Sequence, residues 1–305
     1  MNEHRMSRAS RLRSRSARWR QASARTLVAT AAAGALGVAP AAAQGSGWIP
    51  EMVPMDSAAA PTPWGPGEHL VYGVKLGWFN VGSGALTVEG LDNVRGNPTY
   101  RAVMAINGGA LGFSINDKYT TWFDVRTLQS WRFVRLYGGT YESQRHYEFY
   151  PERDMWDRED NDEFGPMPTK SPLDDIAFVY FLRTLPLEVG QRYTFHRYFK
   201  ETGNPIVVDV VRKDRRKTDA GEFNTIVVRP TFQSEGLFAE DGDAELHFSD
   251  DERRLLVYMR VNISGPGGIS LHLRSIQEGF PVNPESRAEV LGLREQRQKG
   301  SSGRR

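Results

Sequence analysis

Histidine is the side chain best suited to metal binding or proton transfer near neutral pH, and the strand-rich part of the chain contains five. All five fall on the polar side of an alternating pattern, and no two stand at a spacing used by metal ligands. The two best candidates, His247 and His272, would meet only if their strands are neighbours. The spacing therefore favours solvated histidines and predicts no metal site. The five are His69, His146, His196, His247 and His272.

Two acidic runs have the composition of a calcium loop. In Asp157–Glu163, Asp160 and Asp162 match alternating ligand positions, but Phe164 occupies the third position, where an oxygen ligand is required. The run Glu240–Glu245 matches no better. We therefore interpret both runs as solvated loops.

The motifs of nucleophilic and phosphate chemistry are incomplete. Gly82-Ser83-Gly84 lacks the spacing of a nucleophile elbow. The glycine-rich Asn107–Gly112 has neither the Lys-Ser/Thr pair nor the following helix of a phosphate-binding loop. A pair of carboxylates for hydrolysis stays open, because the fold selects such partners. We favour a non-enzymatic protein without a cofactor, and keep a hydrolase of envelope glycans or esters as the alternative.

Aromatic side chains are the remaining candidates for binding. They alternate on one side of the predicted strands, where they form either core or the wall of an apolar groove, and core is favoured. Arg183 lies near the end of an apolar helical segment. It either interacts with the helix dipole or pairs with a sheet carboxylate or an anionic head group. If the groove exists, the predicted ligand-binding residues are Tyr72, Trp78, Tyr119, Phe123, Trp131 and Arg183.

Strands must position these side chains, because the dominant hydrophobic period between Gly67 and Gly279 is two. Turns are expected at 79–84, 107–114 and 212–217, among others, and they separate about a dozen antiparallel strands. A sheet of this size tends to curl or close, because exposed edges promote aggregation. The expected fold is mainly β: a large curved antiparallel sheet or open β-barrel around one short helix. A β-sandwich is the alternative.

One helix is predicted, over Ser171–Leu187. Ser171 is suited to the N-cap and Pro172 to the first helical position, and acidic residues at 174 and 175 complement the helix dipole. Apolar residues cover nearly every side of the segment, which is typical of a helix buried on both sides. We expect the helix to plug the curve between two runs of strands.

The N-terminus has the pattern of an export signal. Residues 1–25 are rich in Arg and Ser, the apolar run Leu27–Ala39 follows, and Ala41–Ala43 predicts cleavage before Gln44. Eight of the 39 basic residues and one of the 37 acidic residues lie in 1–43, which leaves 31 and 36 and a net charge of −5. The alkaline isoelectric point therefore belongs to the leader and gives no support for nucleic-acid binding.

The rest of the chain divides into three predicted parts: a Pro/Ala-rich linker at 44–66, a single β-rich domain at 67–280 and a polar tail at 281–305. No later segment is long and apolar enough to span a bilayer. The chain has no cysteine, so an exported form contains no disulfide and carries no cysteine-linked lipid. The expected location is the periplasm or cell envelope.

Six short motifs, taken in order, resemble a family of bacterial exported proteins, domain of unknown function 3108. The resemblance runs from about Gly67 to Gly279, and Leu255 stands where a proline is expected in many relatives. It implies an exported, mostly β protein without an assigned reaction, so no catalytic residue is carried over. The motifs are Gly67–Tyr72, Gly82–Leu86, Asp174–Arg183, Leu187–Gly190, Thr218–Phe223 and Ser249–Arg254.

Together these features predict an exported cell-envelope protein without catalytic activity. It would bind a lipid, another apolar or amphiphilic ligand, or an envelope partner, but neither nucleic acid nor a metal. A structural scaffold without a ligand is the third possibility. A cavity between the sheet and the helix would favour the ligand-binding hypothesis.

Overall fold

The computed structural model describes residues 62–110, 113–140, 142–232, 244–261 and 268–280. All described residues lie in one compact unit of the chain. Within them, no helix is both long enough and apolar enough to cross a membrane.

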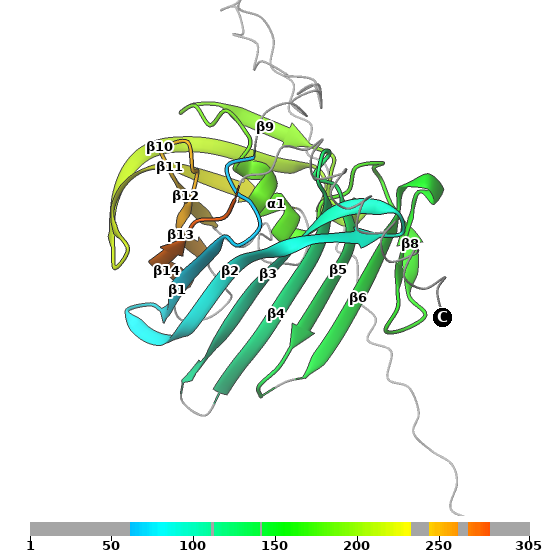
Figure 1. The fold of residues 1–305 in the computed structure, drawn as a ribbon, viewed down its shortest axis with the longest axis horizontal. Coiled ribbons are helices and arrows are strands. Elements are labelled where there is room, and N and C mark those ends of the chain that lie inside the picture. Colours follow the sequence, from blue (N-terminus) through cyan, green and yellow to red (C-terminus); the bar gives the residue numbers. More distant parts are fainter. Residues whose placement is uncertain (1–61, 111–112, 141, 233–243, 262–267, 281–305) are drawn as a thin grey trace, which may run out of the picture. The chain divides into compact units, whose positions relative to one another are not determined.

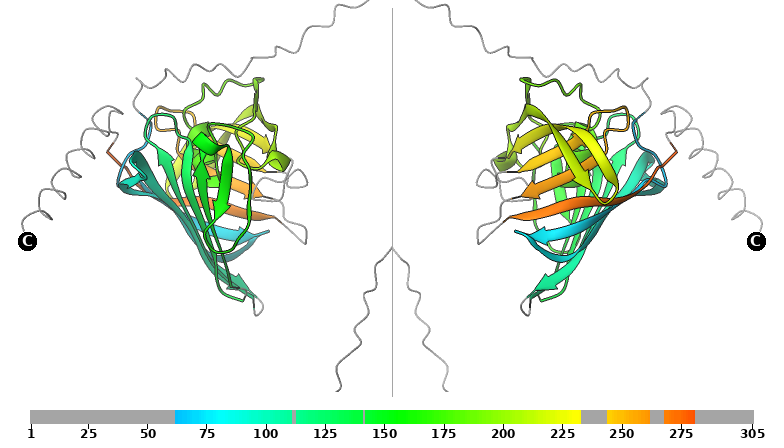
Figure 2. Two further views of the ribbon diagram at one scale, coloured as in Figure 1. Left: turned by 90° about the vertical axis from the view of Figure 1, so that its right-hand side faces the viewer. Right: turned by 90° about the vertical axis from the view of Figure 1, so that its left-hand side faces the viewer.

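Fourteen antiparallel strands of the described residues form one sheet, which curls around a single α-helix, α1 (Figures 1 and 2). The strand order is β8-β7-β6-β5-β4-β3-β2-β1-β14-β13-β12-β11-β10-β9, so β8 and β9 are free edges and the sheet is not closed. The expected open, curved antiparallel sheet is confirmed, and the β-sandwich alternative is wrong. The strands are β1 (His69–Leu76), β2 (Phe79–Val94), β3 (Asn97–Ala110), β4 (Phe113–Asp124), β5 (Ser130–Tyr137), β6 (Ser143–Tyr150), β7 (Met155–Arg158), β8 (Phe164–Pro166), β9 (Arg192–Phe195), β10 (Ile206–Thr218), β11 (Gly221–Thr231), β12 (Glu245–Ser249), β13 (Leu256–Val261) and β14 (Ile269–Gln277).

Helix α1 spans Asp175–Leu182 and is shorter than predicted. Its N-cap is Asp174, whose Oδ1 accepts hydrogen bonds from the N–H groups of Ile176 (2.9 Å) and Ala177 (3.0 Å). The prediction of Ser171 as N-cap is wrong. Leu173 forms an isolated parallel bridge with Tyr198, and its N–H donates to the carbonyl of Arg197 at 2.6 Å. Sheet-like pairing therefore delays the helix by one turn.

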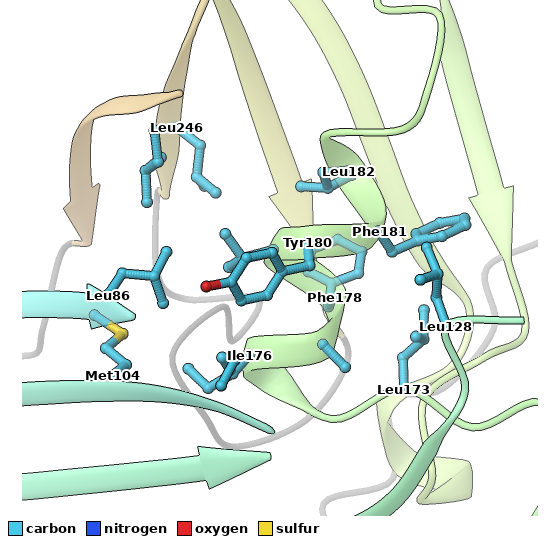
Figure 3. Packing of buried hydrophobic residues seen from close by; sticks show 14 of the residues in the cluster. Leu86, Met104, Leu128, Leu173, Ile176, Phe178, Tyr180, Phe181, Leu182 and Leu246 are labelled. Atoms are coloured by element: carbon cyan, nitrogen blue, oxygen red, sulfur yellow. The ribbon is translucent and has the colours of Figure 1, made fainter. Parts of the chain in front are cut away.

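Every residue of α1 is buried, as its all-round apolarity predicted. Tyr180 stacks on Phe123 of β4, with ring centroids 5.3 Å apart. Phe178 and Phe181 meet aromatic rings from the other end of the sheet order, at Phe232 and Phe195. Figure 3 shows Leu86 and Met104 beside Ile176 and Tyr180 in this core. The helix thus bridges the two halves of the curved sheet.

Three predicted turns are strand instead. Residues 79–84 begin β2, residues 107–110 end β3 and residues 212–217 lie inside β10. The glycines at the first two places allow neighbouring strands to approach closely: a Cβ on Gly82 would lie 2.1 Å from the carbonyl oxygen of Asn107. Glycine therefore signals strand contact here, where the sequence suggested a loop.

Candidate functional site

One row of inward-facing side chains crosses four neighbouring strands beside α1. Leu86 of β2 pairs with Met104 of β3, Met104 with Tyr119 of β4, and Tyr119 with Arg135 of β5. Cross-strand partners point to the same face of a sheet, so the row runs from apolar to cationic on the face that contacts the helix. We take this row and its surroundings as the candidate site.

A small apolar cavity lies at the Leu86 end of the row. Its volume is about 10 Å³, the threshold for one water molecule. No ionisable side chain except the Tyr72 phenol lines it, and its wall includes two methionines. Unbranched methionine side chains adapt readily to a changed shape, so the cavity can enlarge by rotamer changes. The lining residues are Tyr72, Ala85, Leu86, Met104, Ile176, Val179, Leu256, Met259 and Leu271.

The opposite end of the row is a buried ion pair. Nη2 of Arg135 donates to Oδ2 of Asp175 at 2.6 Å, and both side chains are buried. Burial opposes the charge of the guanidinium, but the Asp175 carboxylate and three neighbouring tyrosines together outweigh burial and raise the pKa of Arg135. The Nε of Arg135 has no hydrogen-bond partner in the described part of the chain. An unused donor on a buried cation could bind an acceptor group.

Three further polar groups surround Tyr119. Its hydroxyl donates to Oδ2 of Asp117 at 3.5 Å, and its ring meets the ring of Tyr137 edge-on at 5.8 Å. The N–H of Gly138 donates to the other Asp117 oxygen at 3.3 Å. Burial raises the pKa of Asp117, although its side chain is only half-buried. This polar, aromatic end is thus partly open to solvent.

The far end of α1 is fixed by a second buried ion pair. Nη1 and Nη2 of Arg183 donate to the two carboxylate oxygens of Glu68 at 2.6 and 2.8 Å. The guanidinium also stacks on the ring of Trp64, 5.1 Å from its centroid. Arg183 is completely buried. Of the two charged partners predicted for it, a carboxylate and an anionic head group, the structure shows the carboxylate of Glu68.

Hydrogen-bond donors of the protein surround the N-cap carboxylate of Asp174. Oδ2 of Asp174 accepts from the hydroxyls of Thr121 (2.5 Å) and Ser130 (2.7 Å), in addition to the two backbone bonds of the cap. Burial raises the pKa of Asp174 to about 6. Because its oxygens are saturated by the protein, this carboxyl has a structural role despite its shifted pKa.

The six predicted ligand-binding residues do not form one group. Tyr72 lines the cavity and donates to the carbonyl of Leu256 at 2.9 Å. Phe123 is core. Trp131 is half-buried at a register shift between β4 and β5 and donates to Asp124. Trp78 was expected on the inner face of a strand, but it lies in the β1–β2 turn with 87% of its surface exposed. Only Tyr72 and Tyr119 thus reach the candidate site, and ligand binding by the six stays a prediction.

One histidine, His247, differs from the expectation of solvated side chains. His247 is fully buried and does not lie on a solvated face. Its ring meets that of Tyr258 edge-on at 5.0 Å, and Tyr258 meets His272 in the same way, so Tyr258 separates the two histidines. Burial, followed by the Arg216 charge, lowers the pKa of His247 to about 4. No cluster of three or more potential metal ligands occurs among the described residues.

Acidic residues of the two runs either form ion pairs or lie outside the described residues. Within the first run, Arg158 forms ion pairs with both Asp160 and Glu163. Residues 240–243 of the second run lie outside the described residues. Glu245 accepts from Arg212 and Arg229.

The sequence analysis missed Arg135, although a signal was present. Phe133, Arg135 and Tyr137 alternate along β5, so period two places Arg135 on the apolar face. A charged residue at such a position requires a buried partner. That partner, Asp175, could not be identified before the fold brought α1 to β5.

Comparisons with known proteins give a family. No curated protein matches the chain. A β-barrel-like protein of domain of unknown function DUF1849 from Brucella abortus is 11% identical over 72% of this chain and 100% of its own, with a TM-score of 0.45. A protein from Bacteroides fragilis with a YmcC-like fold, described as exported, is 12% identical over 72% and 100%, with a TM-score of 0.31. The sequence model of the family "Protein of unknown function (DUF3108)" matches residues 71–274.

Proposed function

The chain belongs to this family of proteins of unknown function, DUF3108, and from that premise we propose that it is an exported envelope protein that binds an amphiphilic molecule. The proposal places the molecule on the inner face of the sheet and assigns no catalysis. One observation carries it: Met104, which lines the apolar cavity, is the cross-strand partner of Tyr119, and Tyr119 is the partner of Arg135.

The two ends of the row suit the two ends of an amphiphile. The apolar part would displace the side chains of Met104 and Met259, since the cavity of about 10 Å³ is too small for a hydrocarbon chain. The polar head would accept from the unpaired Nε of Arg135 and approach the Tyr119 hydroxyl. An apolar pocket with a few convergent polar groups is typical of small-molecule sites.

A scaffold without a ligand is the second candidate, and the small cavity volume favours it. In that case α1 is only a plug, fixed by Asp174, by the Arg135–Asp175 pair and by the Arg183–Glu68 pair. The hydrolase alternative draws no support from the described carboxylates near α1, because Asp174, Asp175 and Glu68 all have protein partners.

Titration with a fluorescent fatty acid tests the ligand proposal. We expect the wild-type protein to bind the probe and Met104→Phe, which fills the cavity, to bind it at least about tenfold more weakly. Ala105→Leu is the matched control: it adds volume at the next residue of β3, whose side chain points to the opposite face. Tyr119→Phe should weaken binding of a fatty acid more than that of its methyl ester.

Native mass spectrometry of protein purified from its own envelope complements the titration. A retained mass in the wild type that disappears in Met104→Phe supports the ligand. A clean apo mass together with no probe binding contradicts the ligand and leaves the scaffold. The same spectrum tests export, because a leader cut before Gln44 gives a chain that begins at that residue.

A further inference from the structure

The turn between β1 and β2 presents an exposed aromatic pair that the interior site does not use. Trp78 is 87% exposed and the next residue, Phe79, is 68% exposed. The turn has only two residues, Gly77 and Trp78, and Gly77 adopts a φ of +59°, which glycine allows without strain. Two large apolar side chains are therefore displayed at the end of a tight hairpin (cyan in Figure 1).

The hairpin has a firm base. Leu76 pairs with Phe79 on one side and with Ile269 of β14 on the other, so β1 is flanked by hydrogen-bonded strands up to its last residue. The N–H of Gly77 also donates to the carbonyl of Gly268 at 3.3 Å. Little conformational entropy is lost when such a pre-formed tip meets a partner.

The charges beside the tip are mainly positive. Lys75 lies in β1, three residues before Trp78. Nη2 of Arg274 in β14 donates to Oδ1 of Asn80, the residue after the aromatic pair, at 3.3 Å. Arg274 is paired with Asp219 at 3.4 Å, whereas Lys75 forms no ion pair among the described residues. A tip with two aromatic rings and an unpaired cation complements an apolar phase bordered by negative charge.

We propose that the Trp78–Phe79 tip inserts into the surface of a lipid bilayer, with Lys75 at the level of anionic head groups. Trp is enriched at membrane–water interfaces because its ring is apolar and its N–H can reach water. Basic residues near the surface add attraction to anionic lipids. A protein groove would need a complementary apolar pocket, whereas a bilayer requires only the aromatic tip and the cation seen here. The proposal is independent of the interior site.

Co-sedimentation of the mature protein with vesicles tests the tip. We expect binding to vesicles of phosphatidylcholine and phosphatidylglycerol, and an at least about tenfold loss in Trp78→Ser/Phe79→Ser. The matched control is Phe164→Ser, because Phe164 in β8 has the same 68% exposure as Phe79. Lys75→Glu should weaken binding to the anionic vesicles and leave binding to pure phosphatidylcholine unchanged.

A second readout reports on the position of Trp78 itself. Brominated lipids should quench part of the wild-type tryptophan fluorescence, and Trp78→Phe should remove most of that quenching. Absence of vesicle binding by the wild type, or equal binding by the double variant, overturns the proposal. Equal losses in the double variant and in Phe164→Ser would overturn it too. Fatty-acid binding is measured without vesicles, so either proposal can fail alone.

Discussion

At the scale of single residues, burial distinguishes the ion pairs around α1 from the many surface pairs. Arg183 and Glu68 form a bidentate pair at 2.6 and 2.8 Å with both side chains buried. Arg192 and Asp209 form a pair of nearly the same geometry, at 2.6 and 2.9 Å, but are exposed. The two pairs differ chiefly in burial, which makes one the natural control for the other.

We predict that Arg183→Met lowers the free energy of unfolding by about 3–5 kcal/mol, because it leaves the Glu68 carboxylate buried and unpaired. Arg192→Ala should cost no more than about 1 kcal/mol, since water screens the exposed pair. Urea unfolding measures both. In Arg183→Met/Glu68→Leu the loss should be smaller than in Arg183→Met alone. If Arg183→Met/Glu68→Leu is less stable than Arg183→Met, the pair contributes more to stability than the mutual neutralisation of two buried charges.

The raised pKa of Asp174 predicts that the stability of the fold decreases as the pH rises. An ordinary salt-bridged carboxylate has the opposite effect. Its pKa is about 6 in the folded protein against an ordinary 3.8, so the folded state binds the extra proton. The contribution of the neutral acid to stability is complete below pH 4 and is lost as the pH rises through 6. The shift of about two units corresponds to at most about 3 kcal/mol.

The comparison with Asp174→Asn isolates this effect, since other titrating groups are common to both proteins. We expect the stability of the wild type, relative to the variant, to fall between pH 4 and pH 7. Urea unfolding at several pH values measures this difference. A difference that is flat, or that rises with pH, would contradict the raised pKa.

At the scale of elements, the long hairpin of β10 and β11 also contacts strands that are not next to it in the sheet. Residues 206–209 of β10 pair with β9 and residues 225–228 of β11 pair with β12, whereas β10 also contacts β13 and β14, which are not its neighbours in strand order. Arg216 lies 4.3 Å above the centre of the Tyr258 ring and also donates to His247. The His247–Tyr258–His272 stack is therefore the outer-face surface on which this long hairpin rests.

We predict that Arg216→Ala loosens the hairpin without unfolding the sheet. Loss of the guanidinium over Tyr258 removes a cation–π contact and the donors to His247. Hydrogen exchange of the 212–222 amides should accelerate by about tenfold, while exchange in β3 and β4 stays unchanged. Lys217→Ala, one residue along on the exposed side of β10, serves as the control. Equal acceleration in both variants would contradict the assigned contact.

At the scale of the whole described unit, an open sheet needs a filled interior and protected edges. Helix α1 fills the interior, and its two ends are tied to the sheet by Arg135–Asp175 and Arg183–Glu68. The edge strands are short: β8 has three residues and ends in Pro166, and β9 has four. Short edges with proline offer little template for pairing with another chain.

The sequence by itself determined the class of the fold and its main ingredients. Alternating residues predicted antiparallel strands, and the described residues form fourteen of them in one sheet. The all-round apolar segment predicted a helix buried between strands, which the contacts of Tyr180 and Phe178 confirm. These features are local periodicities, so they can be read from the chain without knowing its partners.

Only the tertiary structure decided the turns, the helix start and the partners of the buried charges. The turn at Trp78 and the strands through Gly82 and Asn107 depend on how closely β2 and β3 approach. The N-cap is Asp174, and not Ser171, because Leu173 pairs with Arg197 and Tyr198, more than twenty residues away. Arg135 and Asp175 are forty residues apart and meet only through the curl of the sheet. Long-range packing, which no local pattern encodes, decides which side chains share an interior.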